Sequence, residues 1–116
     1  MNPELYAILE EANFDPWESV QSILGHTGER AERLRAGILE PKRKYWNLIR
    51  TACELPEPPE TLSELMKYEL EVVEQLTPEQ FEIPLGYGRT MTVAQLIRLS
   101  ARHSVCQAGQ IALTIT

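Results

Sequence analysis

The stretch TVAQLIRLSARHSVCQAGQIAL, residues 92–113, decides the fold of this chain. Its apolar residues recur at spacings of three and four, the repeat that places side chains on one face of an α-helix. Thr92 and Gln95 have the form of a capping box, in which each side chain accepts a hydrogen bond from the other residue's backbone N–H. The pattern therefore predicts a helix that starts at Thr92 and runs to the end of the chain.

Working outward from this helix, the same repeat covers most of the remaining sequence. It predicts a short first helix that ends near Asn13, helical runs over 15–38 and 41–53, and a helix from Thr61 to Leu76. The pattern leaves open whether the second and third runs form one kinked helix or two helices.

Two segments interrupt the helical repeat. LPEPPE, residues 55–60, is the strongest breaker, because each proline lacks an N–H and restricts the residue before it. Residues 77–91 read as a long loop with a tight turn at 86–88, and the strand signal is negligible. We therefore expect an all-α, up-and-down four-helix bundle with one long crossing loop, in a single domain over 1–116.

Length and charge exclude several functional classes. The chain has 116 residues and a formal net charge of −6, which argues against a general affinity for nucleic acid phosphates. No stretch approaches the roughly 20 apolar residues of a membrane span, and the first residues are acidic where a signal peptide is basic. Two cysteines are too few for a disulfide framework. These features favour a cytoplasmic protein with reduced thiols.

The charge is unevenly distributed along the chain. Residues 30–50 hold seven cations and two acids, a net charge of +5, whereas residues 54–82 hold nine acids and one cation, a net charge of −8. One interpretation is two solvated or mutually attracting helix faces. The other is a basic patch that binds an anionic small molecule.

Polar residues follow one stripe of the last helix. Ser100, His103, Gln107 and Gln110 are separated by alternating steps of three and four, so the pattern predicts that they share an inward-facing seam. A buried polar row is costly unless protein groups, water or a metal ion satisfy it. Cys106 lies three residues after His103 and could be a ligand beside it, but it is off this seam, so we expect a buried structural thiol.

Glu69 is the second polar residue in an apolar stripe. It lies at the centre of the face formed by the apolar residues between 62 and 76, so it should be buried. One interpretation is a structural ion pair, with Arg98 or Arg102 as the partner. The other is a metal ligand or general base that faces His103.

Two motifs resemble a known family. WESVQSILGH, residues 17–26, resembles the tryptophan-led helix start of the DinB-like (YfiT-like) four-helix-bundle family, whose second helix carries a histidine. HSVCQAGQI, residues 103–111, resembles that family's last-helix signature: a histidine, three residues, a second histidine, one residue and then Gly-Gln-Ile. The order of the segments between them is similar too, and the resemblance covers about residues 15–113.

The resemblance implies a metal site between the second and last helices. In such proteins three histidines bind a divalent metal, often nickel or zinc. His26 and His103 match two of these ligands, and Gln107 stands where the third histidine should be. By its pattern alone, His26 is a flanking surface or capping residue. The resemblance also implies a metal-dependent transferase acting with a low-molecular-weight thiol, or a hydrolase, because a metal lowers the pKa of a bound thiol or water.

Two departures from the family support an alternative. The amide of Gln107 is a poorer ligand for nickel or zinc than imidazole, although Glu69 could supply a carboxylate in its place. The first helix is shorter than the family's, so a partner subunit would complete the bundle as a homodimer. The alternative is a degenerate, metal-free bundle that acts as a dimerising or partner-binding module. The sequence does not decide whether the protein is an enzyme, and it selects no substrate.

Overall fold

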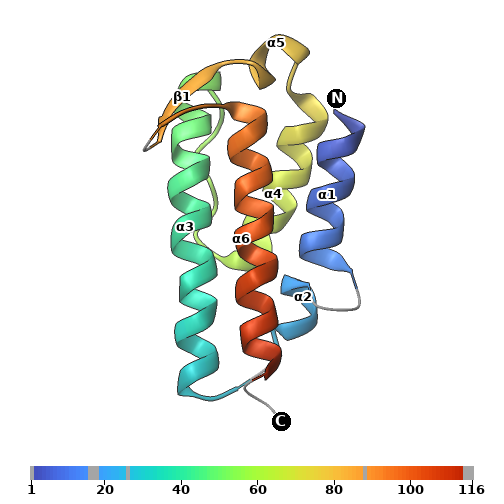
Figure 1. Cartoon of the computed structure of the whole chain (residues 1–116), viewed down its shortest axis with the longest axis vertical. Helices are drawn as coiled ribbons and strands as arrows, with labels where there is room; N and C mark the ends of the chain where they lie inside the picture. Colours follow the sequence, from blue (N-terminus) through green and yellow to red (C-terminus); the bar gives the residue numbers. More distant parts are fainter. Residues whose placement is uncertain (1, 16–18, 26, 88, 114–116) are drawn as a thin grey trace.

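Four long helices lie alongside one another (Figure 1). The structure is a computed structural model, and it describes residues 2–15, 19–25, 27–87 and 89–113. The elements in chain order are α1 (Pro3–Phe14), α2 (Val20–Ile23), α3 (Glu29–Cys53), α4 (Leu62–Gln75), α5 (Pro78–Phe81), β1 (Pro84–Tyr87), β2 (Arg89–Thr92) and α6 (Val93–Leu113). Helices dominate the described residues, which agrees with the all-α prediction.

The direction of the helices differs from the expected up-and-down order. Figure 1 shows α3 and α4 running the same way, and α1 and α6 running the opposite way. Residues 54–61 cause this difference, because they return along the molecule before α4 begins. The core contacts agree: Leu62 and Met66 share a cluster with Ile38, and further along both helices Lys42 pairs with Glu69.

Side-chain caps fix most of the helix starts. Thr61 accepts from the backbone N–H of Glu64, and Thr92 and Gln95 form the reciprocal pair that the sequence predicts. The second predicted run begins at residue 15, and residues 16–18 of that run lie outside the described residues. The observed α2 begins instead at Val20, where Ser19 and Ser22 form a capping box.

The central runs are not one kinked helix, and they do not divide near residue 40. The helix break lies earlier, between α2 and α3, where Gly28 adopts φ 111°, a conformation that suits glycine. Helix α3 then continues unbroken through Pro41. Proline costs about 3 kcal/mol in a helix interior, so tertiary packing of α3 must offset that cost.

The segment predicted as a long loop, 77–91, is more structured than expected. It contains α5 and an antiparallel hairpin in which Pro84 pairs with Thr92 and Tyr87 pairs with Arg89. The hairpin corrects the expectation that the chain has no strands. A hairpin of two four-residue strands is marginal alone, and here the buried side chain of Leu85 anchors it to the main core.

The apolar core has two parts. The larger part surrounds Trp46, which is fully buried, and joins α1, α3, α4 and α6 with α5 and the hairpin. The smaller part joins α2 to α3, α4 and α6 through Val20, Ile23, Ile38 and Ala108. None of the helices in the described residues combines the length and the apolar character needed to cross a membrane.

Candidate functional site

A fully buried polar cluster lies between α1, α3 and α4. The Nζ atom of Lys42 lies 2.7 Å and 2.9 Å from the two carboxylate oxygens of Glu69. Trp46 Nε1 donates to Glu69 Oε2 at 2.7 Å, and Asn13 Nδ2 donates to Oε1 at 2.9 Å. Lys42 also donates to Asn13 Oδ1 at 3.2 Å, which employs the third N–H of its ammonium group.

This cluster decides what the carboxylate of Glu69 can do. The predicted burial of Glu69 is confirmed, since the residue has 0% exposure and Lys42 has 1%. Its ion-pair partner is Lys42 rather than Arg98 or Arg102. Arg98 instead pairs with Glu4 at the surface, at 3.1 Å. Because both Glu69 oxygens accept hydrogen bonds inside the core, the geometry is that of a structural ion pair.

The sequence contained a signal for Lys42. Ile38, Trp46, Ile49 and Cys53 form a helical stripe on α3, and Lys42 lies in the centre of that stripe. Because the segment 30–50 is basic, a lysine within it reads as a solvent-exposed residue, and the pattern therefore did not predict that Lys42 is buried. Two apolar stripes that each contain one central ionisable residue of opposite sign predict a buried pair.

An aromatic pair connects this cluster to the 54–61 segment. The rings of Trp46 and Tyr68 meet edge to face, with centroids 5.6 Å apart. The hydroxyl of Tyr68 donates to the carbonyl of Pro56 at 2.8 Å. Burial raises the pKa of Tyr68, although the positive charge of Arg50 acts in the opposite direction. This hydrogen bond fixes the returning segment against α4.

The polar stripe of α6 is not the inward seam that the spacing predicted. Ser100 is buried, His103 and Gln107 are half-buried, and Gln110 is exposed. The helix is rotated so that Ala101, Ser104 and Ala108 face the core. The hydroxyl of Ser104 donates to the backbone carbonyl of Ser100, so the buried hydroxyl of Ser104 has a partner within the helix. Cys106 is exposed, contrary to expectation, because it lies opposite the rotated apolar face.

His103 and Gln107 are the described residues of the predicted metal set. They lie four residues apart on α6 and therefore on one face of that helix. The Gln107 amide lies beside Gly37, so this face is on the α3 side. A Cβ atom added at Gly37 would lie 3.6 Å from Gln107 Oε1. His26 lies outside the described residues. Within the described part of the chain, no three His, Cys, Asp or Glu residues are grouped closely enough to hold a metal ion.

A cavity of about 470 Å³ lies between α1 and α6. Ile8 and Ala12 line it from α1, and Ala101 and Val105 line it from α6. Val105 has 39% exposure, which is high for a large apolar side chain. Charged residues of both signs, Glu11, Asp15 and Arg102, also line this cavity.

Comparisons with known proteins identify no relatives: no family model matches the chain, and neither a curated protein nor a solved structure matches it.

Proposed function

We propose that this chain is a DinB-like four-helix bundle that binds a divalent metal ion, nickel or zinc, through His26, His103 and Gln107. The observation that carries the proposal is the packing of α2 against α6. Val20 and Ile23 of α2 share a buried cluster with Ala108, the residue after Gln107. His26 follows the end of α2 by three residues in the sequence, and α2 contacts the helix that carries the other two ligands.

The described donors fit such a site in part. His103 supplies an imidazole, a preferred ligand for nickel and zinc, whereas Gln107 supplies a neutral amide oxygen. The half-buried positions of both residues leave them accessible to an ion. Since the described residues contain no complete ligand set, the site depends on His26. A metal bound there would lower the pKa of a coordinated thiol or water, the chemistry of a thiol transferase or hydrolase.

Glu69 has a structural role in this proposal. A catalytic carboxylate must contact the substrate or the reacting water, and Glu69 has 0% exposure. Lys42, Trp46 and Asn13 occupy its oxygens. We also propose a cytoplasmic location, where Cys53 and Cys106, both free thiols, stay reduced.

Metal retention tests the proposal directly. We expect untagged protein that is loaded with nickel or zinc and then desalted to retain about one equivalent of metal. Retention below about a tenth of an equivalent contradicts a site of this kind. His103→Ala should abolish both retention and the stabilisation by metal, which is about 2.7 kcal/mol at a hundredfold excess over Kd.

A gain of affinity gives a sharper test. Gln107→His restores the third imidazole of the family pattern, so we expect it to tighten metal binding by about tenfold or more. Gln75→His is the matched control, because Gln75 is exposed at the end of α4, far along the bundle from His103. Equal effects of the two substitutions would show that Gln107 does not belong to a metal site.

The cavity between α1 and α6 favours a second candidate, a homodimer of a metal-free binding module. A twofold axis places the same patch of two copies face to face, so each contact between two different residues of the patch occurs twice. Here the apolar Ile8 and Val105 would be covered, while Arg102 of each copy faces Glu11 of the other. Mixed charge signs around an exposed apolar centre are compatible with a patch that pairs with a second copy of itself.

Light scattering at micromolar concentration tests the homodimer. We expect a dimer for the natural chain and a monomer for Val105→Lys, which places a cation in the apolar centre of the patch. Glu64→Lys on the exposed start of α4 makes a like-signed charge change away from the patch and should leave the dimer intact. A natural chain that is monomeric at these concentrations would exclude this candidate.

A further inference from the structure

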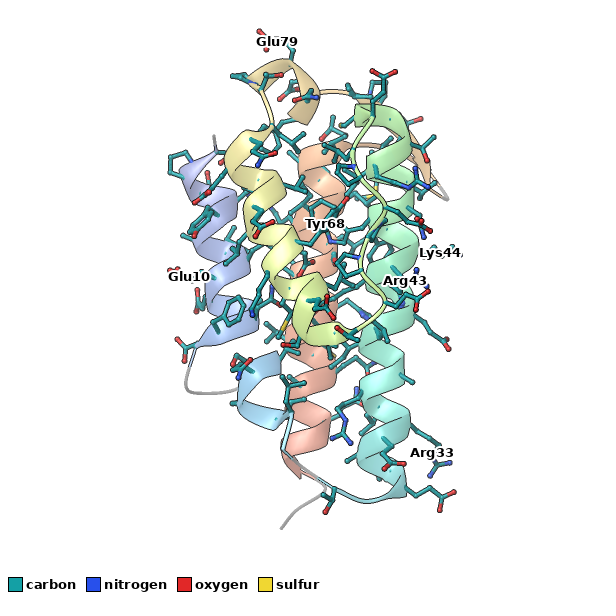
Figure 2. All side chains as sticks on the ribbon, turned by 180° about the vertical axis from the view of Figure 1, so that it is seen from behind. Glu10, Arg33, Arg43, Lys44, Tyr68 and Glu79 are labelled. Atoms are coloured by element: carbon teal, nitrogen blue, oxygen red, sulfur yellow. The ribbon has the colours of Figure 1, made fainter. Side chains whose placement is uncertain are left out.

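A second cavity, of about 530 Å³, lies on the outer side of α3. Two neighbouring rows of α3 form its floor, the first containing Leu39, Arg43 and Asn47, and the second containing Glu40, Lys44 and Leu48. Glu60 lines it from the 54–61 segment. Figure 2 shows this segment passing between α3 and α4, with Arg43 nearer to it than Lys44.

Arg43 has a hydrogen-bond donor in this cavity that no described residue satisfies. Its side chain is half-buried, and its Nε atom is buried without a hydrogen-bond partner. Among the described residues, the side chain of Arg43 makes neither a hydrogen bond nor an ion pair. A guanidinium group presents paired N–H donors in a plane, the geometry that a carboxylate matches with two parallel hydrogen bonds.

The other lining groups restrict the charge and the shape of a ligand. Glu40 and Glu60 are exposed carboxylates in the lining, so they repel a doubly charged anion more than a singly charged one. Leu39 and Leu48 are half-buried and offer apolar surface next to Arg43. A ligand with one negative charge and a short apolar tail satisfies both features.

We propose that this cavity binds a small monoanionic carboxylate with an apolar tail, held by the guanidinium group of Arg43. Leu39 and Leu48 contact the tail, and Asn47 lies beside Arg43 on the same row with an amide that can donate to the carboxylate. The site is separate from the proposed metal ligands of α6, because neither His103 nor Gln107 lines this cavity. In this proposal, the part of the basic segment 30–50 that binds an anion is residues 39–48.

Amide chemical shifts of the full chain test the proposal, with hexanoate as the probe. We expect saturable shifts centred on residues 39–48 and on Glu60. Hexanol lacks the charge and inorganic phosphate lacks the tail and carries more charge, so each should bind at least about tenfold more weakly. The absence of saturable shifts at these residues would overturn the proposal. Equal binding of phosphate or hexanol there would overturn the ligand class.

Variants locate the anchor. Arg43→Gln should weaken hexanoate binding by about tenfold or more, and Arg43→Lys should restore it only in part, because lysine keeps the charge without the paired donors. Arg33→Gln removes an exposed cation from the same helix and is the matched control (Figure 2). Asn47→Asp, which keeps Arg43, should also weaken binding through repulsion. Unchanged affinity in Arg43→Gln or Asn47→Asp would place the carboxylate elsewhere.

Discussion

At the scale of single residues, the buried pair of Lys42 and Glu69 is the feature with the largest expected effect on stability. Every hydrogen-bonding atom of the two side chains has a partner inside the protein, and the indole N–H of Trp46 is one of these partners. Such a cluster stabilises little compared with well-packed apolar residues, but losing one member leaves an unpaired charge in the core. It also fixes the register of three helices, because α1, α3 and α4 each contribute a member.

Breaking the pair should therefore be costly. We expect Lys42→Met to reduce the free energy of unfolding by about 3–5 kcal/mol, and the double variant with Glu69→Met to recover most of that loss. Urea unfolding followed by circular dichroism measures both values. Lys67→Met removes an exposed lysine of α4 and serves as the control. A loss below about 1 kcal/mol for Lys42→Met would show that water reaches Glu69.

Tyr68 should make the protein sensitive to alkaline pH. Burial raises its pKa in the folded state above the ordinary value of 10.0, so the folded state holds the phenolic proton more tightly than the unfolded state. The resulting stabilisation is complete below the unfolded pKa and is lost as the pH rises through the folded pKa. Tyr68→Phe should be less stable near neutrality, because it loses the bond to Pro56, but its stability should fall less above pH 10.0. Equal slopes of melting temperature against pH in the two proteins would contradict this.

The two thiols should differ in reactivity. Cys106 is exposed on α6, whereas Cys53 is buried and burial raises its pKa, which lowers its thiolate fraction. We expect a thiol reagent at neutral pH to modify one cysteine rapidly in the folded protein and both in urea. Cys106→Ser should abolish the rapid phase, and Cys53→Ala should leave it unchanged. A rapid phase that persists in Cys106→Ser would mean that Cys53 is accessible.

At the scale of elements, local signals predicted α1, α4 and α6 well, and predicted the division of the central helices and the connections poorly. The first helix ends within one residue of the predicted Asn13, and the helices predicted to start at Thr61 and Thr92 have these residues as their N-caps. The hairpin was missed because four-residue strands carry too few residues to show a two-residue alternation. Pro41 suggested a helix boundary, but α3 continues because the packing of the buried residues before and after Pro41 outweighs the local cost of a proline in a helix.

The C-terminus of α3 contains a residue that the fold strains. Glu54 has φ 55° in the left-handed region, where glycine is favoured over residues with a Cβ atom. We expect Glu54→Gly to raise the free energy of unfolding by about 1 kcal/mol. Glu57→Gly, at an exposed position in the same segment without this conformation, should not stabilise. The melting temperatures of the two variants give the comparison, and a destabilised Glu54→Gly would refute the capping role.

At the scale of the whole molecule, the topology depends on the segment 54–61. The sequence identified its prolines as a break but could not show where the chain goes afterwards. Direction follows from long-range contacts such as those of Lys42 with Glu69 and of Trp46 with Tyr68. The candidate metal site shows the same limit. Spacing placed His103 and Gln107 on one face of α6, but the rotation of that helix follows from its neighbours.

Shortening the segment 54–61 should destabilise the protein more than lengthening it. Leu62 lies level with Ile38, so the chain must return along about 15 residues of α3, roughly 22 Å at 1.5 Å per residue. The extended chain from Cys53 to Leu62 reaches about 30 Å, and removing three residues shortens it to about 20 Å. Deleting residues 57–59 therefore forces the first turn of α4 to unwind.

We expect that deletion to cost about 3 kcal/mol or more, because the Thr61 cap and the burial of Leu62 are lost together. Inserting Gly-Ser-Gly between Glu60 and Thr61 should cost less than about 1 kcal/mol, since loop-closure entropy grows slowly with length. Urea unfolding of both variants measures the asymmetry. Equal costs would mean that the segment does not span the molecule. In that case α4 would not run parallel to α3, and the buried contacts of Lys42 and Trp46 with α4 could not form as the structure has them.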